Sequence, residues 1–195
     1  MHAERGWPII LELVSTHGVQ PDLVMASGLC HQNEARDWLL NLLSQPCENE
    51  SINLAVVQAL GCWGAEVPIS VVINCLQHPG QLYRLAGLQL LSFRSHCLED
   101  DELLQLCHHL LNDFRDLVVV ETIRVLQRRD GVVISEALSD LCQNGSNAVA
   151  EAALRALGCI ATTASQRCLL ELSQNLDDEN RRLLASKQLS QQFRQ

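Results

Sequence analysis

The stretch AVVQALG at residues 55–61 recurs as AALRALG at residues 152–158, and this repetition decides the fold. Each copy contains a six-residue segment that ends in leucine, and four more segments of the chain share this form. The six segments are VMASGL at 24–29, AVVQAL at 55–60, AGLQLL at 86–91, ETIRVL at 121–126, AALRAL at 152–157 and LASKQL at 184–189. Their closing leucines are 31, 31, 35, 31 and 32 residues apart. A period this regular predicts an array of structural repeats.

A second apolar stretch lies upstream of each six-residue segment. Its apolar residues have helical spacing, as at Leu103, Leu106 and Leu110. Glycine, proline and acidic residues separate the stretches, for example at His78-Pro79-Gly80 and Asp130-Gly131, where helices are expected to end or begin. Each repeat is therefore predicted to be a pair of helices.

The pattern predicts an all-α chain that forms one domain over residues 1–195. We expect an α-solenoid of about six antiparallel helical hairpins, with nearly the whole array present and with its end hairpins acting as caps. The predicted hairpins span residues 4–31, 34–63, 68–95, 100–128, 132–160 and 164–192. The predicted helices are 4–17, 21–31, 34–45, 51–63, 68–77, 81–95, 100–112, 115–128, 132–143, 147–160, 164–175 and 178–192. Residues 117–120, rich in valine, would suit a strand, but their place in the repeat predicts a helix.

The second helix of the repeat resembles that of HEAT-like repeats, particularly the short bacterial type. The resemblance rests on A-x-x-x-A-L-G at 55–61 and 152–158, and on Tyr83-Arg84-Leu85-Ala86, which is similar to the family's V-R-x-A motif. It implies a right-handed superhelix whose second helices line a concave face. The fourth repeat departs from the pattern, because Glu121 replaces an alanine and the spacing rises from 31 to 35 residues. We expect irregular packing there.

The composition limits where the protein works and what it binds. No run approaches the ~20 apolar residues of a membrane-spanning helix, and no signal peptide is visible, so we expect a cytoplasmic protein without membrane insertion. The net charge is −9, and the whole imbalance lies in residues 1–113. This balance argues against binding to nucleic acid or anionic lipid, which requires a basic surface.

Cysteine is frequent but shows no pattern of a disulfide framework or a zinc ribbon. The chain has nine cysteines, an odd number, and no C-x-x-C pair. Most are expected to be small buried hydrophobic residues. These are Cys30, Cys47, Cys62, Cys75, Cys107, Cys142, Cys159 and Cys168.

A polar residue stands two positions before each closing leucine. These residues are Ser27, Gln58, Gln89, Arg124, Arg155 and Lys187. With Arg128, four residues after Arg124, the later members predict a cationic stripe on the inner face. The predicted partner-binding residues are Gln58, Gln89, Arg124, Arg128, Arg155 and Lys187. They would bind an acidic helix or tail of a protein partner; the alternative is a solvated face with intramolecular partners.

Two further groups of residues have the composition of a binding site. Trp63, Tyr83 and Phe93, beside Arg84 and Arg94, could form a binding hot spot, with Trp7 and Trp38 in first helices. Packing is the favoured role for Trp38 and Trp63, since the core has few large rings. His96-Cys97 and Cys107-His108-His109 could bind zinc, but they lack the usual ligand spacing, so we predict no metal and no cofactor.

The sequence lacks the motifs of several enzymes that have the resembled architecture. HEAT-like hydroxylases carry His-Glu pairs, which this sequence lacks, and HEAT-like DNA glycosylases need a basic groove. The sequence also lacks G-x-S-x-G, P-loop and G-x-G-x-x-G patterns. We therefore expect a non-enzymatic interaction scaffold, adaptor or assembly factor. The alternative is a subunit of a bilin lyase-type HEAT-repeat enzyme, whose activity resides in a heterodimer surface and leaves little local signature.

Overall fold

A computed structural model describes residues 3–45 and 49–193, and these residues form twelve α-helices, two short 3-10 helices and no strand. The predicted all-α class is confirmed. The packing divides the chain into two compact units, residues 1–94 and residues 95–195. The first contains α1 (Ala3–His17), α2 (Pro21–Gly28), α3 (Asn33–Ser44), α4 (Glu50–Leu60), η1 (Gly61–Glu66), α5 (Ile69–Gln77) and α6 (Gln81–Arg94). The second contains η2 (Ser95–Cys97), α7 (Asp100–Leu111), α8 (Asp116–Leu126), α9 (Val132–Asn144), α10 (Asn147–Ile160), α11 (Thr163–Asn175) and α12 (Glu179–Gln192).

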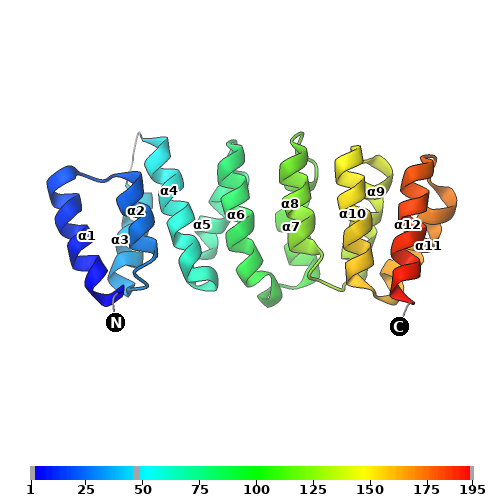
Figure 1. The fold of residues 1–195 in the computed structure, drawn as a ribbon, viewed down its shortest axis with the longest axis horizontal. Helices are drawn as coiled ribbons and strands as arrows, with labels where there is room; N and C mark the ends of the chain where they lie inside the picture. The colour runs from blue at the N-terminus through cyan, green and yellow to red at the C-terminus, as the bar shows by residue number, and fades with distance from the viewer. Residues whose placement is uncertain (1–2, 46–48, 194–195) are drawn as a thin grey trace. The chain divides into compact units, whose positions relative to one another are not determined.

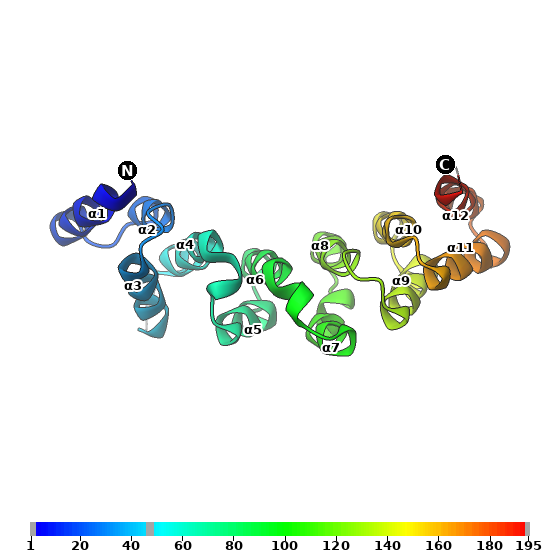
Figure 2. The same cartoon turned by 90° about the horizontal axis from the view of Figure 1, so that it is seen from below.

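Consecutive helices pair within each unit. In the second unit α7 packs on α8, α9 on α10 and α11 on α12, while α10 lies between α8 and α12 (Figure 1). Figure 2 shows that α8, α10 and α12 form one layer of this unit and that α7, α9 and α11 form a second layer, below the first in that view. In the first unit α2, α4 and α6 are neighbours in the same way, and α1, α3 and α5 pack against them.

Side-chain caps begin several helices where the sequence places polar residues. Asn49 accepts a hydrogen bond from the Ser51 N–H at the start of α4, and Asp178 accepts one from the Arg181 N–H at the start of α12. Ser146 caps α10 and also donates from its hydroxyl to Asp116, at 2.8 Å. Such caps satisfy N–H groups that the first turn of a helix leaves unpaired.

The repeated six-residue segments share one pattern of burial. In α4, α6, α8 and α10 the second, third, fifth and sixth positions are buried, and the fourth is exposed. The closing leucines Leu60, Leu91, Leu126 and Leu157 are completely buried. The pattern holds in α8 despite Glu121, so the irregular packing expected there is not seen in that helix.

The first segment does not follow this register. Ser27 is buried and donates a 2.7 Å hydrogen bond to the Val24 carbonyl, whereas Leu29 is 69% exposed. The physical reason is the close contact of α2 with α4, because a Cβ atom on Gly28 would lie 2.8 Å from the Ala59 oxygen. Glycine is needed at that point and α2 ends there, three residues before the predicted end. Ser27 is therefore buried, unlike the polar residues that stand two positions before the closing leucine in α4, α6, α8 and α10.

The cysteines follow the prediction in part. Five are buried, namely Cys30, Cys75, Cys107, Cys142 and Cys168. Burial raises the pKa of Cys107 and of Cys142 to about 12 and that of Cys75 to about 11, as expected of thiols away from water. Cys62 is partly exposed and Cys159, at the end of α10, is exposed, so the prediction of burial is wrong for Cys159. Cys47 lies outside the described residues.

Candidate functional site

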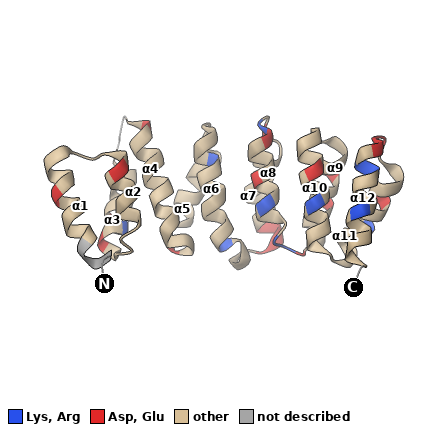
Figure 3. Ribbon diagram, in the orientation of Figure 1, with Lys and Arg blue, Asp and Glu red and all other residues tan. Residues whose placement is uncertain are grey.

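The second unit carries three exposed basic side chains on neighbouring helices of one layer. Arg124 lies on α8, Arg155 on α10 and Lys187 on α12, each at the fourth position of its segment. Figure 3 shows basic segments at similar heights on these three helices. Three members of the predicted stripe thus lie on adjacent helices, and we call Arg124, Arg155 and Lys187 the basic row.

Both arginines of the basic row pair with a glutamate of their own helix. Arg124 forms an ion pair with Glu121, and Arg155 donates from Nε and Nη2 to Glu151 Oε1, at 3.1 and 2.6 Å. The side chains of both arginines are 62% exposed, and ion pairs in such surroundings contribute about 0.2–1 kcal/mol each. Arg124 and Arg155 therefore have partners within the protein, as expected if this face is an ordinary solvated surface.

Lys187 differs from the two arginines. One turn before it α12 carries Leu183, which is exposed, in the place that Glu151 takes on α10. Among the described residues Lys187 forms no ion pair. The charge of the basic row is therefore least compensated at α12.

Arg128 does not take its predicted place on α8. The helix ends at Leu126, and the N–H of Arg129 bonds to the Leu126 carbonyl in the turn that follows. The guanidinium of Arg129 holds this turn by donating to Asp100 at 2.6 Å and to the Ser95 carbonyl at 2.8 Å. Arg128 is exposed in this turn, so the prediction of an i, i+4 pair with Arg124 on one helix is wrong.

The two predicted glutamines belong to the first unit. Gln58 on α4 and Gln89 on α6 are both exposed, at the fourth positions of their segments. Since α4 and α6 are packed side by side, the first unit has its own exposed polar pair, without charge.

The aromatic residues mainly pack. The rings of Trp7 and Trp38 lie 5.4 Å apart, Trp63 is buried, and the buried Tyr83 donates from its hydroxyl to the Glu50 carbonyl at 3.1 Å. Packing of this kind uses both the apolar body and the polar tip of tyrosine. Phe93 is 41% exposed and lies against Gly64, whose backbone angles, φ 54° and ψ −119°, favour glycine.

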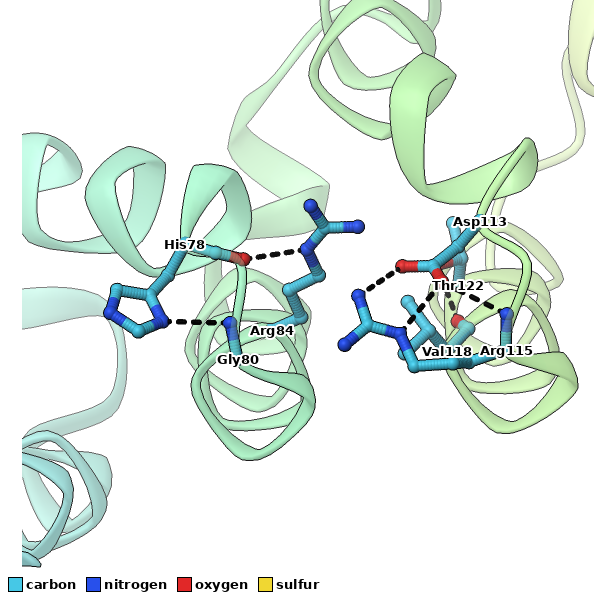
Figure 4. Close-up of polar contacts among 7 residues, drawn as sticks. All are labelled: His78, Gly80, Arg84, Asp113, Arg115, Val118 and Thr122. Carbon is cyan, nitrogen blue, oxygen red and sulfur yellow. Dashed lines mark hydrogen bonds and ion pairs between the residues drawn. The ribbon is translucent and has the colours of Figure 1, made fainter.

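Arg94 donates to the Ala65 carbonyl at 2.9 Å, whereas Arg84 and Arg182 each connect the two helices of a hairpin. Arg84 donates from Nε to the carbonyl of His78 at 2.7 Å, while the Gly80 N–H donates to His78 Nδ1 at 3.0 Å (Figure 4). Arg182 donates to the Leu176 carbonyl at 2.8 Å, and both arginines stand seven residues before their closing leucine. A cation there satisfies the carbonyl that ends the preceding helix.

A separate arginine orders the turn between α7 and α8. Arg115 makes a two-pronged contact with Asp113, from Nε at 2.8 Å and Nη2 at 2.9 Å (Figure 4). The Asp113 side chain is fully buried, and its hydrogen bond to Arg115 raises the pKa of that guanidinium. In the same view the buried Thr122 donates from its hydroxyl to the Val118 carbonyl, inside α8.

Arg181, which the sequence analysis missed, connects α12 to the preceding hairpin. Its guanidinium donates to the carbonyls of Cys142, Gln143 and Gly145 and to Asn147 Oδ1, over 2.9–3.3 Å. A polar pocket of about 430 Å³ lies beside it, bounded by Glu171, Asp177 and Asp178 among others. The spacing of apolar residues within a helix does not predict a contact between hairpins. In the sequence, only the two adjacent arginines, Arg181 and Arg182, mark this position as unusual.

The histidines and cysteines considered for zinc are not gathered into a site. Cys107 is fully buried and its pKa of about 12 keeps the thiol protonated, whereas His108 and His109 are exposed on the same helix. Within residues 3–45 and 49–193 no three side chains of the metal-binding types come together. In the same ranges no helix has the length and apolar character to span a membrane.

No protein-family model matches the sequence, and a search of curated proteins found no match.

Proposed function

We propose that this protein is a protein-interaction module, namely a right-handed α-solenoid of about six HEAT-like hairpins that serves as a scaffold, adaptor or assembly factor. The second helices would line its concave face and present their exposed side chains to a protein partner. A repeat scaffold suits this task because stacked hairpins display one extended surface.

The observation that carries the proposal is the burial pattern of the repeated segments. In α4, α6, α8 and α10 a single exposed position, occupied by glutamine or arginine, stands between pairs of buried ones, and Lys187 continues the line on α12. The pairing of helices into hairpins within each unit further supports the solenoid.

The thiols support a cytoplasmic location. All eight cysteines in the described residues are free, and several are buried among apolar side chains. Reduced cysteine used as a small hydrophobic residue is typical of a reducing compartment.

Site-specific photo-crosslinking in the source cell tests the proposal. A photoreactive amino acid placed at Gln58, Gln89 or Arg155 should give abundant adducts with one or a few proteins. The matched outer positions are Glu136 and Arg167, which are exposed on α9 and α11. Adducts that form equally well from the outer positions would contradict a binding face on the second helices.

A further inference from the structure

The basic row has a spacing that suits one kind of partner. Arg124, Arg155 and Lys187 lie on three adjacent packed helices, at the same place in each repeat. Packed helices are about 8–10 Å apart. A chain crossing these helices would therefore meet one basic side chain every 8–10 Å.

An extended polypeptide reaches the same distance in three residues. A strand rises about 3.3 Å per residue and a polyproline II helix about 3.1 Å, so residues i and i+3 are about 9–10 Å apart. In polyproline II every third side chain also points to the same side. Carboxylates at every third residue would each face one member of the basic row.

The native ion pairs favour an extended partner over a helical one. The Glu121 and Glu151 carboxylates contact the guanidiniums of the basic row directly, with Arg155 Nη2 2.6 Å from Glu151 Oε1. An acidic helix about 10–12 Å in diameter would bring further carboxylates close to these two glutamates, whereas an extended segment brings one carboxylate to each basic side chain.

The two glutamates also argue against a nucleic acid. A phosphate backbone carries charge more densely than a peptide with one carboxylate in three residues, and it would be repelled by Glu121 and Glu151. The charge pattern is better matched by sparse carboxylates.

We infer that the α8, α10 and α12 face of the second unit binds an extended acidic segment of a partner protein, with Asp or Glu at every third residue. The inference rests on the proposed function and specifies its partner. The bound carboxylates replace Glu121 and Glu151 as partners of Arg124 and Arg155. Exposed ion pairs exchange at little cost, so the native pairs hold the arginines in place without blocking the face.

Binding of two dye-labelled peptides to the full chain, measured by fluorescence anisotropy at low salt, tests the inference. The first is (Glu-Pro-Pro)4, which places glutamates about 9.3 Å apart along one side. The second has the same composition with its four glutamates adjacent. The spaced peptide should bind several-fold more tightly. Equal affinity, or no binding of either peptide, would overturn the inference.

Three variants and a control test whether the side chains of the basic row and Glu151 affect peptide binding. Arg155→Gln and Lys187→Gln, on different helices, should each weaken binding of the spaced peptide about two- to fivefold. Arg167→Gln is the matched control, because Arg167 is 64% exposed, pairs with a glutamate four residues away and lies on α11. An equal loss in Arg167→Gln would mean that binding does not use the basic row. Far-UV circular dichroism confirms that each variant is folded.

The third variant, Glu151→Gln, distinguishes this inference from a purely structural role. Removing the competing carboxylate should strengthen binding of the spaced peptide by a few fold. Weaker binding, or tighter binding of single-stranded DNA than of the peptide, would contradict the inference. If the peptides fail while crosslinks still form from the second helices, the proposed function stands and only the acidic segment is wrong.

Discussion

Replacing Arg181 by methionine removes the guanidinium that joins α12 to the preceding hairpin while keeping most of the aliphatic stem. The variant loses four contacts, to the carbonyls of Cys142, Gln143 and Gly145 and to Asn147. Three of the acceptors are at the end of α9, where carbonyls lack partners within the helix. The last hairpin should therefore be held less firmly.

The contacts of Arg181 allow an estimate of the cost. Hydrogen bonds to a charged group contribute about 1.5–3 kcal/mol each when well shielded, but water can replace part of these at the surface. Nε is buried without a hydrogen-bond partner among the described residues, which already reduces the benefit of the side chain. We expect Arg181→Met to lower the free energy of unfolding by about 2–3 kcal/mol.

Urea unfolding followed by circular dichroism measures this change. With an unchanged m-value, the shift in midpoint reports the change in stability. Arg182→Met is the control, because within the described part of the chain the Arg182 side chain makes one hydrogen bond, to the Leu176 carbonyl. This substitution should cost about 1 kcal/mol. A loss for Arg181→Met no larger than that of the control would refute the role assigned to Arg181.

Three further predictions concern packing and burial. Leu157→Ala should cost about 2–5 kcal/mol because the side chain is fully buried, whereas Leu29→Ala, at an exposed leucine, should cost less than about 0.5 kcal/mol by urea unfolding. Gly87→Ala should lower the melting temperature, since its Cβ would lie 2.8 Å from a side chain of α5, but Gly61→Ala, with 3.6 Å to its nearest atom, should not. Burial raises the Cys107 pKa from 9.0 to about 12, so the unfolded chain releases this proton first and stability falls as pH rises above 9. The loss from this thiol is about 1.4 kcal/mol at pH 10, and Cys107→Ala should show a correspondingly weaker fall between pH 8 and pH 10.

The sequence predicted the helices well because two periods reinforce each other. Helical spacing marks each apolar stretch, and the repeat of 31–35 residues fixes which helix is which, so residues 117–120 were assigned correctly against their β propensity. The ends were predicted less well. The early end of α2 depends on the contact of Gly28 with α4, and the end of α8 on the turn held by Arg129; both involve another part of the chain.

The candidate site, too, was predictable from the sequence only in part. The exposed positions of Gln58, Gln89, Arg124, Arg155 and Lys187 follow from the register of the repeat, which assigns a face to each residue. The contacts of Arg181 do not, because they join residues 34–39 positions apart through side-chain donors and backbone carbonyls. A pattern of apolar residues does not predict hydrogen bonds of this kind.

Small-angle X-ray scattering of the full chain tests the proposed solenoid most directly. Six hairpins stacked at steps of about 8–10 Å would form an array roughly 50–60 Å long, with a radius of gyration of about 20 Å. A compact globular domain of this length has a radius of gyration of about 16 Å. A monodisperse monomer near 20 Å is the expected result, and a monomer near 16 Å would contradict the solenoid and the extended binding face that depends on it.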